Sequence, residues 1–168
     1  MLCAFVGCHA QDRSREYQVK AIFLYNFTQF VEWPSSAFPE KNSPLVIGIA
    51  GKDPFGNYLD DAVRNEKVGE HPLIVHRFET MEDVTGCHIL FVNIQDKNVL
   101  REYLHKLAER AVLTVGDSDH FIRDGGMVRL VPDNNRIRMQ INVTATRDAG
   151  LIISSKLLRL AEIVSSKK

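Results

Sequence analysis

The chain of 168 residues lacks any excess of charge, since 21 lysine and arginine residues balance 21 aspartate and glutamate residues. A balanced chain produces no overall field that would attract nucleic acid or an anionic membrane. It also lacks a continuous apolar run of the roughly 18 residues that a transmembrane helix requires. These absences exclude a nucleic-acid-binding protein and leave an ordinary globular chain, with the length of one domain.

Cysteine is scarce, with three residues at Cys3, Cys8 and Cys87. The first two lie in an N-terminal stretch that we expect to be removed, which leaves Cys87 alone in the mature chain. A single thiol forms no intrachain disulfide. Because Cys87 directly precedes the apolar run "HILFV", we expect a small buried side chain rather than a reactive thiol.

The first ten residues resemble the end of a secretory signal peptide. "MLCAFVGCHA" is nearly uncharged, and small residues precede a cleavage site after Ala10, where a polar stretch begins. The basic start of a signal is missing and the apolar part is short. We therefore predict an atypical or truncated signal remnant at residues 1–10 and a single exported domain at residues 11–168. Lipidation of Cys8, in "FVGC", is the alternative route of export.

Motifs that bind phosphate or metal are absent. The glycine-containing turn "GIAGKDPFG" follows an apolar run, but Asn57 and Tyr58 stand where a Walker loop has lysine and then serine or threonine. The dinucleotide pattern G-x-G-x-x-G and the histidine spacings H-x-H and H-E-x-x-H do not occur. The sequence therefore predicts no cofactor, no metal and no catalytic residue.

Two loops remain as candidates for a small-ligand or catalytic site, because they follow predicted strands, where open α/β sheets bind ligands. They are residues 53–56 and residues 116–120, and the second contains Asp117, Asp119 and His120. Aspartate and serine after a strand commonly cap the next helical turn. We expect capping, and we keep a small-ligand-binding or enzymatic α/β domain as the alternative function.

Continuous apolar runs alternate with helical patterns along the first two thirds of the chain. The predicted strands are residues 45–50, 73–78, 88–92 and 111–115, the predicted helices begin at Asp53 and span residues 95–110, and a capped turn is predicted at residues 80–84. Runs without alternation are typical of strands buried on both faces. This order predicts a three-layer α/β fold with a mostly parallel sheet flanked by helices.

The pattern changes in the last third. "GGMVRLVPDNNRIRMQINV" predicts an antiparallel hairpin at the C-terminal margin of the sheet, with its turn at Pro132–Asn135. Arginine and glutamine alternate with apolar residues in its second strand, so one face of this strand is expected to be exposed to solvent. Asn142 is expected to cap a short helix that Gly150 ends, and Ser154 to cap a terminal helix.

A helix near the N-terminus has more apolar surface than one sheet covers. At about 100° per residue, one stripe is predicted to face the core; it consists of Val19, Ile22, Phe23, Asn26, Phe27, Phe30 and Trp33. A second strip lies beside it, and the predicted terminal helix has a similar surplus. We predict a homodimer and a partner-binding surface to which these side chains contribute. The predicted partner-binding residues are Tyr17, Leu24, Val31, Leu160 and Ile163.

Five blocks of the chain resemble, in order, those of a known family. They read "EYQVKAIFLYNFTQFVEWP", "PLVIGIAGKDPFG", "GCHILFV", "VLTVGDSDHFIRDGGMVRLV" and "RIRMQINVTATRDAGLIISSKLLRLA". The family is the YfiR-like family of periplasmic regulatory proteins, and the resemblance extends from about Glu16 to Ala161. It implies a small exported α/β protein without enzymatic activity.

The resemblance also implies a regulatory function. The family's namesake binds the periplasmic part of an inner-membrane diguanylate cyclase and represses it, which limits cyclic-di-GMP and biofilm, and an outer-membrane lipoprotein sequesters it under envelope stress. For this chain the resemblance implies an inner-membrane partner, either a diguanylate cyclase or a sensor kinase. The namesake has disulfides that Cys87 alone does not reproduce. No binding residue transfers from the family to a position here.

Overall fold

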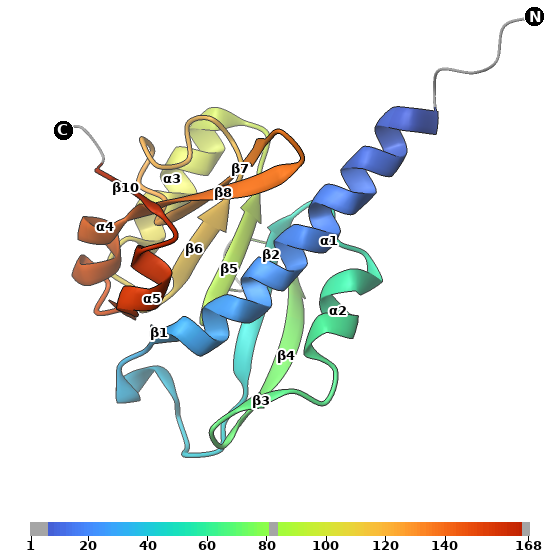
Figure 1. Cartoon of the computed structure of the whole chain (residues 1–168). Coiled ribbons are helices and arrows are strands. Elements are labelled where there is room, and N and C mark those ends of the chain that lie inside the picture. Colours follow the sequence, from blue (N-terminus) through green and yellow to red (C-terminus); the bar gives the residue numbers. More distant parts are fainter. Residues whose placement is uncertain (1–6, 81–83, 166–168) are drawn as a thin grey trace, which may run out of the picture.

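The computed structural model describes residues 7–80 and 84–165, with side chains from Gln11 onward. An eight-stranded sheet runs through the protein in the order β10-β8-β7-β6-β5-β2-β4-β3, with helices on both faces (Figure 1). Its strands are β2 (Leu45–Gly51), β3 (Lys67–Val68), β4 (His71–Phe78), β5 (Ile89–Asn93), β6 (Leu113–Gly116), β7 (Val128–Asp133), β8 (Arg136–Asn142) and β10 (Glu162–Val164). The predicted fold class is confirmed.

The helices form the outer layers. They are α1 (Gly7–Phe30), α2 (Asn57–Val63), α3 (Lys97–Leu107), α4 (Val143–Asp148) and α5 (Ser155–Leu158), with a 3-10 turn, η1, at Ser35–Ala37. A small antiparallel sheet pairs β1 (Val31–Glu32) with β9 (Ile152–Ile153), and so joins the end of α1 to the C-terminal region. The predicted cleavage after Ala10 falls within the first turns of α1, and residues 1–6 lie outside the described part.

The central strands are apolar throughout because both of their faces are buried. In β5, Ile89 and Phe91 pack in the core beneath α1, whereas Leu90 and Val92 pack in the core beneath α3. Side chains of successive strand residues point to opposite faces, so each strand supplies both cores. Strands β4, β2, β5 and β6 pair in parallel, as the continuous runs predict.

The C-terminal hairpin forms as predicted, but it is not the margin of the sheet. Its turn residues Asn134 and Asn135 have φ of 46° and 62°, a left-handed conformation that asparagine tolerates and that two-residue hairpin turns require. Beyond β8 lies β10, which pairs with β8 in parallel. The prediction of a long terminal helix is therefore wrong. Ser154 does cap α5, but α5 ends at Leu158 and Ile163 lies on the edge strand.

Two physical reasons explain this difference. The spacing of leucine, isoleucine and valine after Ser154 suits a helix, yet Ile163 and Val164 are β-branched and favour a strand. The outer edge of β8 also offers backbone groups that a strand, but not a helix, can satisfy. Local propensity and periodicity could not reveal that this edge would be free.

The capping predictions have mixed outcomes. Asn142 caps α4, as predicted, and Asp96 caps α3 by accepting from the backbone N–H groups of Asn98 and Val99. The prediction that Asp53 begins a helix is wrong, because Gly56 has φ of 54° and α2 starts only after it. The predicted turn at residues 80–84 falls largely on residues 81–83, outside the described residues.

Helix α1 turns a different face to the sheet from the one predicted. Leu24 and Phe27 are fully buried in the core, whereas Val19 and Ile22 of the predicted core stripe are 40% and 53% exposed. The helix also ends at Phe30, so Trp33 lies beyond it. The core face is thus rotated toward the strip that was expected to be surplus, and part of the predicted core stripe faces solvent instead.

Candidate functional site

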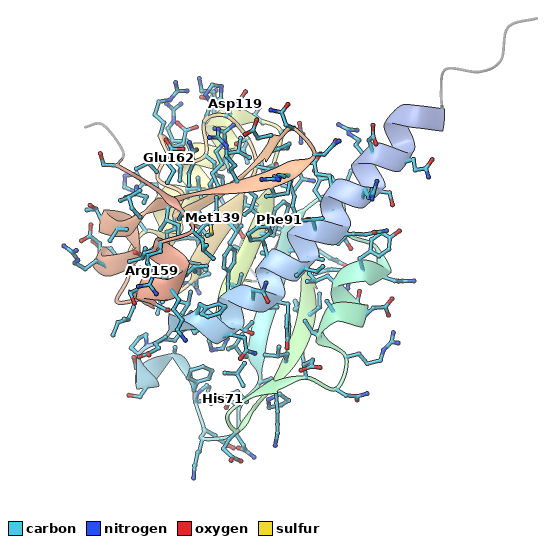
Figure 2. The ribbon with its side chains drawn as sticks, viewed as in Figure 1. His71, Phe91, Asp119, Met139, Arg159 and Glu162 are labelled. Carbon is cyan, nitrogen blue, oxygen red and sulfur yellow. The ribbon has the colours of Figure 1, made fainter. Side chains whose placement is uncertain are left out.

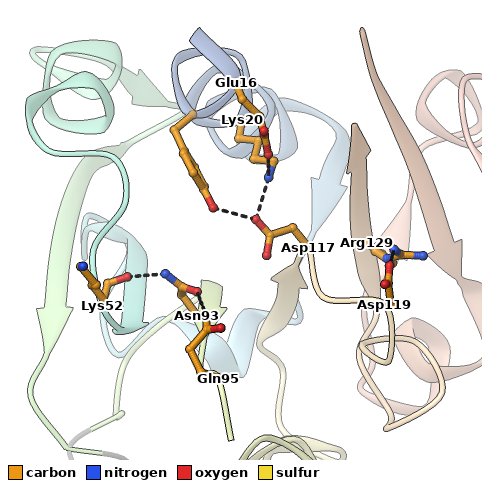
Figure 3. Close-up of polar contacts among 9 residues, drawn as sticks. Glu16, Lys20, Lys52, Asn93, Gln95, Asp117, Asp119 and Arg129 are labelled. Atoms are coloured by element: carbon orange, nitrogen blue, oxygen red, sulfur yellow. Dashed lines mark hydrogen bonds and ion pairs between the residues drawn. The ribbon is translucent and has the colours of Figure 1, made fainter. Parts of the chain in front are cut away.

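The carboxyl ends of β5 and β6 border a small cavity, at the sheet edge where open α/β folds bind ligands. Its volume is about 70 Å³, and its lining consists of Val92, Asn93, Ile94, Gln95, Lys97, Leu100, Asp117, Ser118 and His120. Asn93 donates to the backbone carbonyl of Lys52 and accepts from Gln95, so these amides bind one another across the strand ends (Figure 3). The cavity is well below the 300 Å³ or so that encloses a typical cofactor.

Asp117, the first residue after β6, is bound by α1. Its Oδ2 accepts from the Tyr17 hydroxyl at 3.0 Å and from Lys20 Nζ at 2.6 Å. Lys20 is fully buried and also pairs with Glu16 one turn earlier (Figure 3). Burial, together with the Asp117 charge, raises the pKa of Tyr17 well above its usual range. The cluster of Glu16, Tyr17, Lys20 and Asp117 therefore fastens the helix to the strand-end loop.

The remaining charged side chains of the two candidate loops are also paired within the chain. Asp53 accepts from the backbone N–H of Phe55 and from Arg77 Nε at 2.7 Å. Arg77 reaches Asp60 as well, and its hydrogen bonds lower the pKa of that carboxyl. Asp119 pairs with Arg129. Both loops thus use their charged groups mainly for internal contacts.

Metal-binding geometry is not found in the described part of the chain: no group of three or more histidine, cysteine, aspartate or glutamate side chains could hold a metal ion there. Cys87 is buried, and its Sγ lies 3.0 Å from the carbonyl oxygen of Ile89, to which it donates. Burial raises the pKa of this thiol to about 12. A thiol with that pKa is not a nucleophile near neutral pH, so the expectation of a small buried residue is confirmed.

The five predicted partner-binding residues fall into two groups. Leu24 and Val31 lie in the core, with exposures of 0% and 5%, and Tyr17 is half-buried against Asp117. The expectation that these three form surplus helix surface is therefore corrected. Leu160 and Ile163 are 79% and 54% exposed, although they lie on a turn and an edge strand rather than a helix.

Charged residues accompany these exposed side chains. Lys156 on α5 and Arg159, which directly follows α5, are exposed, while Leu157 between them is buried. Neither cation forms an ion pair with any described residue. We call Lys156, Arg159, Leu160 and Ile163 the C-terminal platform; Figure 2 shows Arg159 close to this end of the chain. Sequence reasoning selected its apolar members for partner binding and did not select its cations.

Lys20 is the functional-site residue that the sequence concealed most completely. Its spacing from Glu16 predicts only an ordinary helical ion pair, and Asp117 is 97 positions away. A lysine is rarely fully buried unless it is paired, and nothing local indicates that pairing.

A comparison with protein families places the chain. Among the helices of the described residues, none combines the length and the apolar character needed to cross a bilayer. A family model described as YfiR/HmsC-like matches residues 17–162, which include the large sheet from β2 to β8 and the first residue of β10. The chain therefore belongs to the YfiR/HmsC-like family, whose members are periplasmic regulators of diguanylate cyclase signalling.

Proposed function

We propose that this protein is a non-enzymatic repressor that binds the periplasmic part of an inner-membrane diguanylate cyclase and limits cyclic-di-GMP and biofilm. Export would occur by cleavage after Ala10, with lipidation of Cys8 as the alternative. A sensor kinase is the second candidate for the membrane partner, and an outer-membrane lipoprotein is a candidate for the protein that releases the repression. Membership of a regulatory family supports this proposal.

The observation that carries the proposal is the exposure of the C-terminal platform. Leu160, at 79%, is the most exposed of the large hydrophobic side chains among the described residues, and Ile163 lies three positions further along the chain. Exposed apolar side chains beside unpaired cations are typical of surfaces that bind another protein. The polar strand-end loops, by contrast, are largely occupied by their own contacts.

A small-ligand-binding or enzymatic function is the weaker candidate. It would use residues 53–56 and 116–120, where Asp53 and Asp117 already accept hydrogen bonds from other parts of the chain. A ligand at either carboxylate would have to replace these contacts or share the carboxylate with them. The cavity of about 70 Å³ beside Asp117 admits only a very small molecule.

The platform should be required for repression. We expect the double variant Leu160→Asp, Ile163→Asp to bind the membrane cyclase at least about tenfold more weakly than wild type, because central apolar anchors commonly contribute 2 kcal/mol or more to an interface. The measurement uses the full-length diguanylate cyclase in nanodiscs. Its rate of cyclic-di-GMP formation is followed as wild-type or variant protein is added.

Val99→Asp supplies the matched control, because Val99 is a partly exposed apolar residue on α3, away from the platform. It should repress as well as wild type does. If wild-type protein neither binds the cyclase nor changes its output, the cyclase is not the partner. If the double variant represses normally, the C-terminal platform is not the binding surface, but the proposal that the protein represses the cyclase is retained.

A homodimer is part of the same proposal. Ile22 and Val19 leave an apolar strip exposed on the outer side of α1, and a second copy could cover it or the platform. We expect a light-scattering mass of twice the mass of one chain at micromolar concentration. Ile22→Asp should lower this mass if the dimer forms through α1, and Leu160→Asp should lower it if the dimer forms through the platform. A monomer mass for wild type would refute the dimer.

A further inference from the structure

Phe38 is held between two histidine rings at the amino edge of the sheet. Its ring stacks on His71 with centroids 3.9 Å apart and on His88 with centroids 4.4 Å apart, each at an interplanar angle of 20°. His71 begins β4 and lies at the lower end of the molecule in Figure 2, and His88 directly precedes β5. Phe38 belongs to residues 33–43, the segment that leads from β1 to β2, here called the amino-edge segment.

Hydrogen bonds fasten the same segment to the same histidines. His88 Nε2 lies 3.2 Å from the carbonyl oxygen of Ala37, and His71 Nδ1 lies 2.7 Å from the carbonyl oxygen of Ser43. Trp33 adds a third point, because its Nε1 donates to the carbonyl oxygen of His88 at 3.0 Å. The amino-edge segment is thus held at its start, its middle and its end.

The contacts of His88 require its neutral form. The backbone N–H of Val46 donates to His88 Nδ1 at 3.1 Å, so this nitrogen must keep its lone pair and the ring proton resides on Nε2. Protonation of Nδ1 would place two N–H groups against each other. His88 is only 2% exposed, so the imidazolium would also be buried without a carboxylate to pair with it.

The charged surroundings of this ring are few. The titratable group that faces His88 across Phe38 is His71, and Glu40 and Lys41 on the amino-edge segment are exposed to solvent. Burial is the main reason why the pKa of His88 is lowered, and the positive charge of His71 adds to it. Because the folded pKa lies below the unfolded value, the neutral His88 contacts are complete above about pH 6.5 and are lost as the pH falls through the folded pKa.

We propose that His71 and His88 form an acid-sensitive clamp on Phe38, which holds the amino-edge segment closed near neutral pH and releases it when His88 is protonated. Histidine is the side chain whose charge changes in this pH range. On release, Phe38 leaves the space between the two rings and Trp33 loses its acceptor. The segment follows β1 directly, so opening begins beside the β1–β9 pair. This inference does not depend on the proposed function.

The protein contains its own reporter for this movement, because Trp33 is its single tryptophan. The indole ring lies edge-on to His88 with centroids 5.9 Å apart. We expect the tryptophan emission of the full chain to lose intensity and shift to the red as the pH is lowered from about 8 to 5, with a midpoint below about 6.5. Far-UV circular dichroism should keep its native amplitude over the same range.

The variant His88→Gln tests the assignment to one side chain. A glutamine amide can accept from the Val46 N–H and donate to the Ala37 carbonyl oxygen, but it does not take up a proton in this range. We expect it to abolish the change in emission. His105→Gln, at an exposed position on α3, should leave the change as it is in wild type.

Nitrogen NMR of the histidine rings in the wild-type protein makes the test independent of any variant. His88 should be the Nε2–H tautomer at neutral pH and should become charged at the pH where the Trp33 emission changes. Three results would each overturn the proposal: no emission change down to about pH 5, an unchanged transition in His88→Gln, or a His88 ring that stays neutral below the transition.

Discussion

Replacing Asp117 with alanine should destabilise the protein by about 3 kcal/mol, the low end of what is measured when one partner of a buried ion pair is removed. The substitution leaves the fully buried Lys20 ammonium without the acceptor that lies 2.6 Å away. It also leaves the Tyr17 hydroxyl without its acceptor. Glu16 still pairs with Lys20, which is why we expect the lower end of the range.

A double-mutant cycle separates the pair from the packing. Lys20→Met keeps most of the apolar length of the side chain and removes the charge, so the double variant with Asp117→Ala should be more stable than the sum of the two single losses predicts. We expect a coupling energy of about 1–3 kcal/mol. Urea unfolding of all four proteins gives the free energies, provided that the slopes agree.

Asp119→Ala is the matched control, because Asp119 is two positions away and its ion pair with Arg129 is formed by a side chain that is 86% exposed. An exposed pair contributes at most about 1 kcal/mol. If Asp117→Ala cost no more than Asp119→Ala, the Lys20 cluster would not fasten α1 to the loop. The same comparison tests the strand-end alternative, since a ligand site would lose binding in Asp117→Ala beyond the fraction that unfolds.

The sheet could be predicted from the sequence, and the Lys20 cluster could not, for one physical reason. Strands β2, β5 and β6 can be recognised in the sequence because burial on both faces makes nearly every position apolar. Caps such as Asn142 and Ser154 depend on residues one turn away and are equally visible. The partner of Lys20 lies in a different element, and no local pattern specifies it.

The predictions for the edge of the sheet and for the buried face of α1 were wrong for related reasons. A run such as Leu160 to Val164 fits a helix or a strand, and the free edge of β8 decides between them. In α1, two apolar strips overlap, so the hydrophobic period does not say which one meets the sheet. The buried face of α1 also contains Lys20. An apolar pattern does not count a lysine as a core residue, so it could not identify this face.

Leu24→Ala and Ile22→Ala should therefore have very different effects on stability, although both shorten an apolar side chain on the same helix. Leu24 is fully buried in the core with Phe27, so its truncation should cost about 2–5 kcal/mol. Ile22 is 53% exposed, and its truncation should change the free energy of unfolding by no more than about 0.5 kcal/mol. Urea unfolding of the two variants gives both values.

The same two variants also test whether Leu24 contributes to partner binding. If Leu24 belongs to the core alone, Leu24→Ala should bind the membrane cyclase as wild type does once the unfolded fraction is subtracted, and the loss should reverse at lower temperature as that fraction shrinks. Equal and small stability losses in Leu24→Ala and Ile22→Ala would mean that α1 turns its other face to the sheet. The stripe that contains Val19 and Ile22 would then be the core after all, and Leu24 would return to the surface as a candidate contact.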